Sequence, residues 1–134
     1  LADLHRVLPD ADAVFVALAL TPETQQVIGG AELALMKHTA WIVNVARGGH
    51  IDTAALVTAL QDEAIGGAAL DVTEPEPLPD GHPLWTLPNC LITPHVANTP
   101  EMGLELLARR VTSNVERYLA DQQLLGPVNT KAGY

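Results

Sequence analysis

Four short apolar runs, separated by turn residues and helix-forming segments, constrain the fold of this chain most strongly. The runs span residues 14–18, 41–46, about 67–72 and 90–93. Their continuous rather than alternating apolar character is typical of strands covered on both faces. Helical patterns lie between them at 31–36 and 53–62. Strands that alternate with helices form right-handed βαβ units, so the sequence predicts an α/β fold built on a parallel sheet.

Local signals place the boundaries of the helices. Asp52 is a capping residue for the helix from Thr53 to Asp62, whose apolar face carries Ala55, Leu56, Ala59 and Leu60. The sequence Thr99-Pro100-Glu101 has a capping hydroxyl, a first-turn proline and an acid near the positive helix end. It opens a helix that runs to about residue 120 with an apolar stripe. Residues 73–89 hold five of the ten prolines and are expected to form an ordered loop, and 21–24 are expected to form a turn.

Composition excludes several classes of protein. The 134 residues are enough for one domain with a core, and the net charge of −9 argues against nucleic acid as a partner. No apolar run approaches the roughly 20 residues needed to cross a bilayer, so no membrane partner is expected. Cys90 is the single cysteine, so the chain can form no internal disulfide. We interpret it as a small hydrophobic residue in a strand, and a free cysteine is compatible with the reducing cytoplasm. The start at Leu1 has neither an initiator methionine nor a secretory signal, and we interpret the chain as a piece of a longer protein.

Three ionisable side chains follow the ends of successive predicted strands. Arg47 comes after 41–46, Glu76 lies just beyond 67–72, and His95 follows 90–93. Because ligands of open parallel sheets bind beyond the carboxyl ends of the strands, this pattern predicts a binding crevice. An arginine there can hold a carboxylate with two hydrogen bonds, and a histidine can carry a proton near neutral pH. The alternatives are a surface Arg47 paired with an acid and a His95 satisfied by a backbone carbonyl.

Two further acids are candidates, and several kinds of site are excluded. Glu74 competes with Glu76 as the partner of His95, and both sit in a proline-bounded stretch that is otherwise a solvated acidic loop. Asp71, at the end of the third run, can cap a turn or accept a hydrogen bond from a ligand. The spacing of His and Cys predicts no metal site. The chain contains no Gly-x-Ser-x-Gly elbow and no Walker-type or dinucleotide-type glycine loop.

These motifs together resemble the D-isomer-specific 2-hydroxyacid dehydrogenase family. The resembling stretches follow one another at the family's spacings from about residue 10 to 120: Leu20-Thr21-Pro22-Glu23-Thr24, Leu33 to Lys37, Val43-Asn44-Val45-Ala46-Arg47-Gly48-Gly49, Gly66 to Val72, Glu74-Pro75-Glu76-Pro77-Leu78-Pro79, His82-Pro83-Leu84-Trp85 and Leu91-Ile92-Thr93-Pro94-His95. Several matches in register are far more specific than a lone glycine motif.

The resemblance implies a function and a role for each matched residue. The parent enzyme would be an NAD(P)-dependent oxidoreductase that interconverts a small 2-keto acid and a D-2-hydroxy acid. Arg47 would bind the substrate carboxylate and carbonyl, and His95 would act as the general acid/base with Glu76, rather than Glu74, as its partner. The implied contacts to NAD or NADP are Leu18, Ala19, Thr24, Val45, Ala46, Arg47, Asp71 and His95. Ala19, Thr73 and Ala97-Asn98 depart from the residues usual in the family, and Thr73 and Asn98 are positions where substrate fit could differ.

The resemblance covers only part of the family's architecture. We expect a partial Rossmann-like sheet of about four strands with flanking helices, because the first half of the dinucleotide-binding domain is absent. Residues 1–125 would form the second half of that domain, and 126–134 a tail or link toward the substrate domain. The first strand would then present an unpaired apolar edge. We expect the isolated chain to be inactive and the parent to be a cytoplasmic homodimer; the alternative is an NAD-sensing, corepressor-like binding protein of the same fold.

Overall fold

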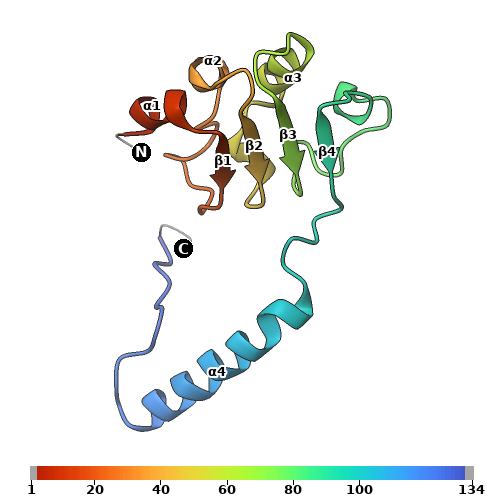
Figure 1. Ribbon diagram of the computed structural model, residues 1–134. Coiled ribbons are helices and arrows are strands. Elements are labelled where there is room, and N and C mark those ends of the chain that lie inside the picture. Colours follow the sequence, from red (N-terminus) through yellow and green to blue (C-terminus); the bar gives the residue numbers. More distant parts are fainter. Residues whose placement is uncertain (1–2, 132–134) are drawn as a thin grey trace. The chain divides into compact units, whose positions relative to one another are not determined.

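The computed structural model describes residues 3–131, which divide after His95 into two compact units. The first unit contains a four-stranded parallel sheet in the order β1-β2-β3-β4 (Figure 1). Its strands are β1 (Ala13–Val16), β2 (Trp41–Asn44), β3 (Gly67–Leu70) and β4 (Cys90–Ile92). The predicted α/β fold with a parallel sheet of about four strands is therefore confirmed.

Helices connect the strands and supply the core of this unit. They are α1 (Leu4–Val7), α2 (Gly30–Leu35) and α3 (Thr53–Gln61), together with the 3₁₀ turns η1 (Leu8–Asp10), η2 (Gly48–His50) and η3 (Pro83–Trp85). As predicted, the Asp52 carboxylate caps α3 by accepting the N–H of Ala55 at 3.0 Å. Leu33 of α2 and Leu56 and Leu60 of α3 are buried in one cluster with strand residues. The helical segment at residues 4–10 was not predicted.

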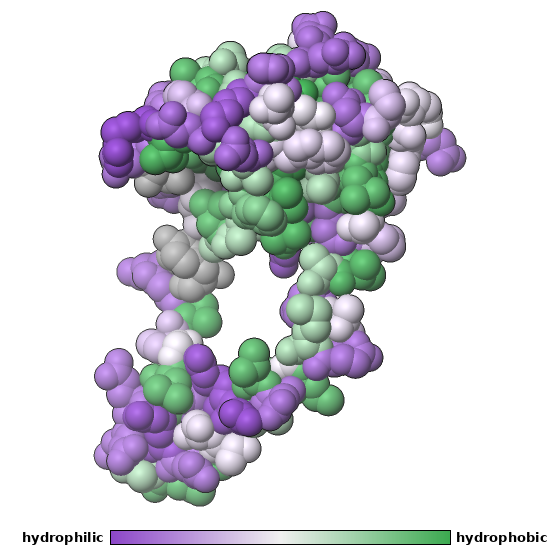
Figure 2. Space-filling model, in the orientation of Figure 1, coloured by the Kyte–Doolittle hydropathy of each residue, from purple (hydrophilic) through white to green (hydrophobic). Residues whose placement is uncertain are grey.

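Register decides which side of the sheet the helices cover. Ile42 pairs with Val14 and Ala68, and both Ile42 and Ala68 are fully buried in the helix-packed cluster. The next set of paired residues along the strands, which includes Phe15 and Leu91, points to the opposite face. There Phe15 and Leu91 remain 69% and 59% exposed. Figure 2 shows hydrophobic surface over the strand region of this unit. Within the described part of this first unit, the helices therefore cover one face of the strands, whereas the apolar runs had predicted cover on both faces.

All four strands are shorter than their apolar runs, β2 and β3 by two residues each. β2 ends at Asn44 instead of residue 46, because the Asn44 side chain turns the chain out of the sheet by accepting the N–H of Ala46. β3 ends at Leu70, after which the N–H of Asp71 still reaches the carbonyl of Asn44. β1 pairs with no described strand other than β2, so it forms the expected edge.

The second unit is built on α4 (Pro100–Leu119), which begins and ends as predicted. Thr99 stands at the N-cap, but its hydroxyl makes no cap hydrogen bond, so the capping role predicted for it was wrong. Within the described part of this unit, the apolar stripe predicted on the helix is exposed; it consists of Leu104, Leu107, Val111, Val115 and Tyr118. Asn114 holds the following segment by exchanging two hydrogen bonds with Leu125. In residues 3–131 no helix combines the length and the apolar character that a membrane span requires.

Candidate active site

The end of β2 holds the main chain around Arg47 in a fixed turn. Asn44 is 1% exposed; its Oδ1 accepts the N–H of Ala46 at 3.0 Å, and its Nδ2 donates to the carbonyl of Arg47 at 2.9 Å. The Arg47 side chain is exposed, and its Nη1 donates to the carbonyl of Ala46 at 2.6 Å. The backbone of Arg47 is thereby anchored while its guanidinium lies at the surface, where an anion can reach it.

The Arg47 turn packs directly against the segment that follows β3. A Cβ placed on Gly48 would lie 2.0 Å from the carbonyl oxygen of Thr73, so only glycine permits this approach. The hydroxyl of Thr73 donates to the carbonyl of Pro75 at 2.9 Å, and the hydroxyl of Thr53 donates to the carbonyl of Glu74 at 2.7 Å. These contacts fix the loop that leads to Glu76.

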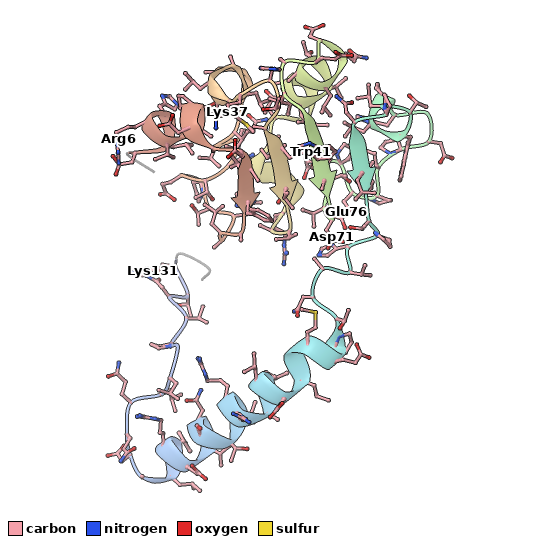
Figure 3. The ribbon with its side chains drawn as sticks, viewed as in Figure 1. Arg6, Lys37, Trp41, Asp71, Glu76 and Lys131 are labelled. Carbon is pink, nitrogen blue, oxygen red and sulfur yellow. The ribbon has the colours of Figure 1, made fainter. Side chains whose placement is uncertain are left out.

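Glu76 and His95 form a hydrogen bond beyond the ends of β3 and β4. The distance from Glu76 Oε1 to His95 Nδ1 is 2.7 Å, and the two side chains are 42% and 48% exposed. The structure therefore joins His95 to Glu76, as predicted, while Glu74 contributes its backbone carbonyl to Thr53. Figure 3 shows Glu76 and Asp71 at the edge of the sheet toward which the strand arrowheads point.

His95 has a backbone conformation that few residues other than glycine adopt. Its φ is +58°, in the left-handed region, and its N–H donates to the carbonyl of Thr93 at 3.0 Å. Strained backbone of this kind concentrates at functional sites, where surrounding contacts hold it in place. Here the short turn after β4 directs the imidazole toward Glu76.

Asp71 is nearly buried at the end of β3, with 6% of its surface exposed. The Thr93 hydroxyl donates to its Oδ1 at 2.6 Å. This hydrogen bond joins the ends of β3 and β4 and orients the carboxylate. The Asp71 carboxylate is thus held in one orientation at this edge of the sheet.

The other predicted cofactor contacts lie beyond β1 and β2. Thr24 closes the loop after β1: its hydroxyl donates to the carbonyl of Ala19 at 2.7 Å and accepts the N–H of Thr21 at 2.7 Å. This hydroxyl therefore shapes the main chain at Ala19, next to the half-buried Leu18. Val45 is 42% exposed and Ala46 is 8% exposed.

Sequence reasoning missed three residues that build this site: Asn44, Thr53 and Thr93. Each acts through a hydrogen bond to a neighbouring loop or strand end. Asn44 carried a local signal, since a buried asparagine at the end of an apolar run commonly turns the chain. Thr53 and Thr93 carried none, because their partners lie 21 and 22 residues away in the sequence.

Residues 1–97 match the model of a protein family, the NAD binding domain of D-isomer specific 2-hydroxyacid dehydrogenases. The chain belongs to this family, and the resemblance seen in its motifs is confirmed. The fold and the strand-end groups described above agree with a dinucleotide-binding class of protein.

Curated relatives and solved structures support the same assignment. The glycerate dehydrogenase of Methylorubrum extorquens is 43% identical over 122 residues, which are 90% of this chain and 39% of that protein. A D-isomer specific 2-hydroxyacid dehydrogenase from Xanthobacter autotrophicus Py2, solved with NADPH and MES, matches with a TM-score of 0.86 and 40% identity. That match covers 100% of this chain and 55% of the solved one. The NADPH-dependent glyoxylate/hydroxypyruvate reductase of Sinorhizobium meliloti, solved with NADP and sulfate, matches with a TM-score of 0.87 and 31% identity, over 99% of this chain and 43% of the other. The chain thus spans about two fifths of the length of these curated relatives.

Proposed function

We propose that this chain is the second half of the NAD(P)-binding domain of an oxidoreductase that interconverts a small 2-keto acid and a D-2-hydroxy acid. The observation that carries the proposal is the 2.7 Å contact between Glu76 Oε1 and His95 Nδ1 beyond the ends of β3 and β4, while Arg47 follows the end of the neighbouring parallel strand β2. In this proposal residues 1–125 belong to the half-domain, and 126–134 lead toward a substrate domain.

The groups at this edge suit the nicotinamide end of NAD or NADP. Asp71 is a nearly buried carboxylate, oriented by Thr93, that can accept a hydrogen bond from a carboxamide N–H. The exposed Val45, the adjoining Ala46 and the Leu18-Ala19 turn offer apolar surface and backbone groups after the ends of β2 and β1. When bound, the cofactor supplies or accepts the hydride, and the residues of this chain bind, orient and move a proton.

His95 supplies the proton in the direction of reduction. Its Nδ1 faces Glu76, so Nε2 is the ring nitrogen that serves the substrate. Negative charge develops on the carbonyl oxygen as the keto acid is reduced, and a protonated imidazole neutralises that charge by donating its Nε2 hydrogen. Glu76 holds the ring in one orientation and stabilises the imidazolium. In oxidation the same nitrogen takes the hydroxyl proton.

The net charge of −9 repels an anionic substrate, and Arg47 supplies a local positive charge that attracts it. A guanidinium matches the planar carboxylate of a 2-keto acid and stabilises the developing oxyanion next to it. The exposed side chain on an anchored backbone suits both tasks.

The test uses the full-length protein, with glyoxylate and hydroxypyruvate as probe substrates and NADH or NADPH as cofactor. We expect Arg47→Ala to lower kcat/KM by about 10²–10³-fold, as loss of one oxyanion-stabilising group does elsewhere, with cofactor affinity nearly unchanged. Glu76→Gln should lower kcat, whereas the matched control Glu74→Gln, two residues away, should retain activity.

Turnover by Arg47→Ala equal to that of the wild type would contradict the catalytic assignment and favour an NAD-sensing binding protein. We further expect the isolated 134-residue chain to show no turnover, because its sequence has no pyrophosphate-binding glycine turn. Measurable reduction of either keto acid by the isolated chain would refute that expectation.

A further inference from the structure

His50 lies in the interior of the first unit, although nothing in the sequence singled it out. It closes the 3₁₀ turn η2 and is 0% exposed. Histidine is seldom fully buried, because its polar ring must leave water and find partners in the interior. A buried imidazole one turn after Arg47 therefore requires a physical reason.

One ring nitrogen of His50 has a specific partner and the other has none. Nδ1 lies 2.9 Å from the carbonyl oxygen of Arg47. A carbonyl oxygen only accepts, so the ring hydrogen sits on Nδ1. Nε2 is buried and has no hydrogen-bond partner among the described residues. An apolar side chain would avoid this unpaired atom, so the hydrogen bond to Arg47 is what distinguishes histidine at this position.

The carbonyl of Arg47 is held from three directions. Besides His50 Nδ1, it accepts from Asn44 Nδ2 at 2.9 Å and from the backbone N–H of His50 at 3.3 Å. A carbonyl oxygen has two lone pairs, so these donors fully occupy it. They fix the peptide plane that follows Arg47, and with it the direction in which the arginine side chain leaves the main chain.

We infer that His50 is a positioning residue for Arg47: its Nδ1–H, together with Asn44, holds the Arg47 carbonyl so that the guanidinium points at the substrate. The inference rests on the proposed function, because it concerns substrate binding by Arg47. Fixing the backbone in advance reduces the freedom that Arg47 loses when a carboxylate binds, so the expected effect is on the KM of the keto acid.

The first test needs no substitution. Long-range proton–nitrogen NMR correlations of the full-length protein report which ring nitrogen of His50 carries the hydrogen. We expect the Nδ1–H form. Observation of the Nε2–H form would overturn the inference, since an unprotonated Nδ1 cannot donate to a carbonyl.

The second test uses substitutions that separate the two ring nitrogens. The amide nitrogen of His50→Asn reaches the place of Nδ1, whereas that of His50→Gln extends toward Nε2. We expect His50→Gln and His50→Leu to raise the KM for glyoxylate about tenfold, as the loss of one buried hydrogen bond does. His50→Asn should stay within about threefold of wild type, and the KM for the cofactor should not change in any variant. The exposed His38 provides the matched control as His38→Asn.

Each outcome decides the inference. A purely structural role would lower the midpoint of urea unfolding while leaving the KM for glyoxylate unchanged, and that result would overturn it. If His50→Leu does not fold, the comparison of His50→Asn with His50→Gln and the NMR measurement still decide. If Arg47→Ala loses activity as expected and the His50 variants match the wild type, the inference about His50 fails while the proposed function stands. If Arg47→Ala is fully active, the proposed function itself has failed.

Discussion

The absence of a side chain at Gly48 sets how closely the Arg47 turn packs against the segment after β3. In Gly48→Ala the new Cβ would lie 2.0 Å from the oxygen and 2.1 Å from the carbon of the Thr73 carbonyl. Non-bonded carbon contacts relax at about 3.5 Å, so one segment must retreat by roughly 1.5 Å. Both sides of the contact are backbone, and neither can yield by changing a rotamer.

The expected loss has two parts. Overpacking of this kind destabilises proteins by about 1–3 kcal/mol. The retreat also displaces the loop that carries Glu76, and a misplacement of about 1 Å at a catalytic group can lower a rate about 10²-fold. We expect Gly48→Ala to show both losses, measured by urea unfolding and by kcat/KM for glyoxylate in the full-length protein.

Gly49→Ala is the matched control. A Cβ there would meet the Leu20 Cδ2 methyl at 3.2 Å, and that partly exposed side chain can move aside. Neither glycine has a positive φ, so both accept alanine conformationally and the variants differ only in their contacts. If Gly48→Ala unfolds at the same urea concentration and turns over at the same rate as Gly49→Ala, the reasoning from the Thr73 contact is refuted.

Three further predictions concern single contacts. The pKa of Glu32 is lowered below its ordinary value of 4.5, chiefly by the hydrogen bond from His5, so this carboxylate stabilises the fold above that pH. We expect the free energy of unfolding to fall as the pH drops below 4.5, and to fall less in Glu32→Gln. Burial raises the pKa of the Cys90 thiol from 9.0 to about 11, and iodoacetamide at pH 8 should therefore modify it roughly 100-fold more slowly than an unburied cysteine. Thr93→Val removes the hydroxyl that orients Asp71, which should weaken NAD(P)H binding by about tenfold, measured by fluorescence titration.

A specific experimental result would contradict each of these three predictions. A Glu32→Gln variant with the same acid unfolding curve as wild type would remove the role given to that carboxylate. Alkylation of Cys90 at the rate of a free thiol would show that the thiol is not desolvated. Unchanged cofactor affinity in Thr93→Val, alongside an unchanged Thr86→Val control, would show that Asp71 needs no orientation by its neighbour.

The strands and the two longer helices were predictable because their signals are local. The runs that contain β1, β2 and β3 are predominantly apolar, and Asp52 caps α3 by accepting the N–H of a residue three positions on. The ends of the first three strands were placed two residues too late. For β2 the reason is that hydropathy does not register the turn that Asn44 makes with its own side chain. The short helix α1 escaped prediction for the opposite reason: its four residues contain no buried side chain and no side-chain cap.

What the sequence determined by itself is the order of strands and helices and the position of a charged group after each of three strands, since both follow from neighbouring residues. The tertiary structure alone decided which contacts those groups make. The Glu76–His95 pair, the Gly48–Thr73 approach and the Thr93–Asp71 hydrogen bond all join residues about 20 or more positions apart. The contact from His50 to the Arg47 carbonyl is close in sequence, yet its meaning depends on burial that only the packed core provides. Parallel strands bring distant chain segments to one edge, and that closure in space has no local signature in the sequence.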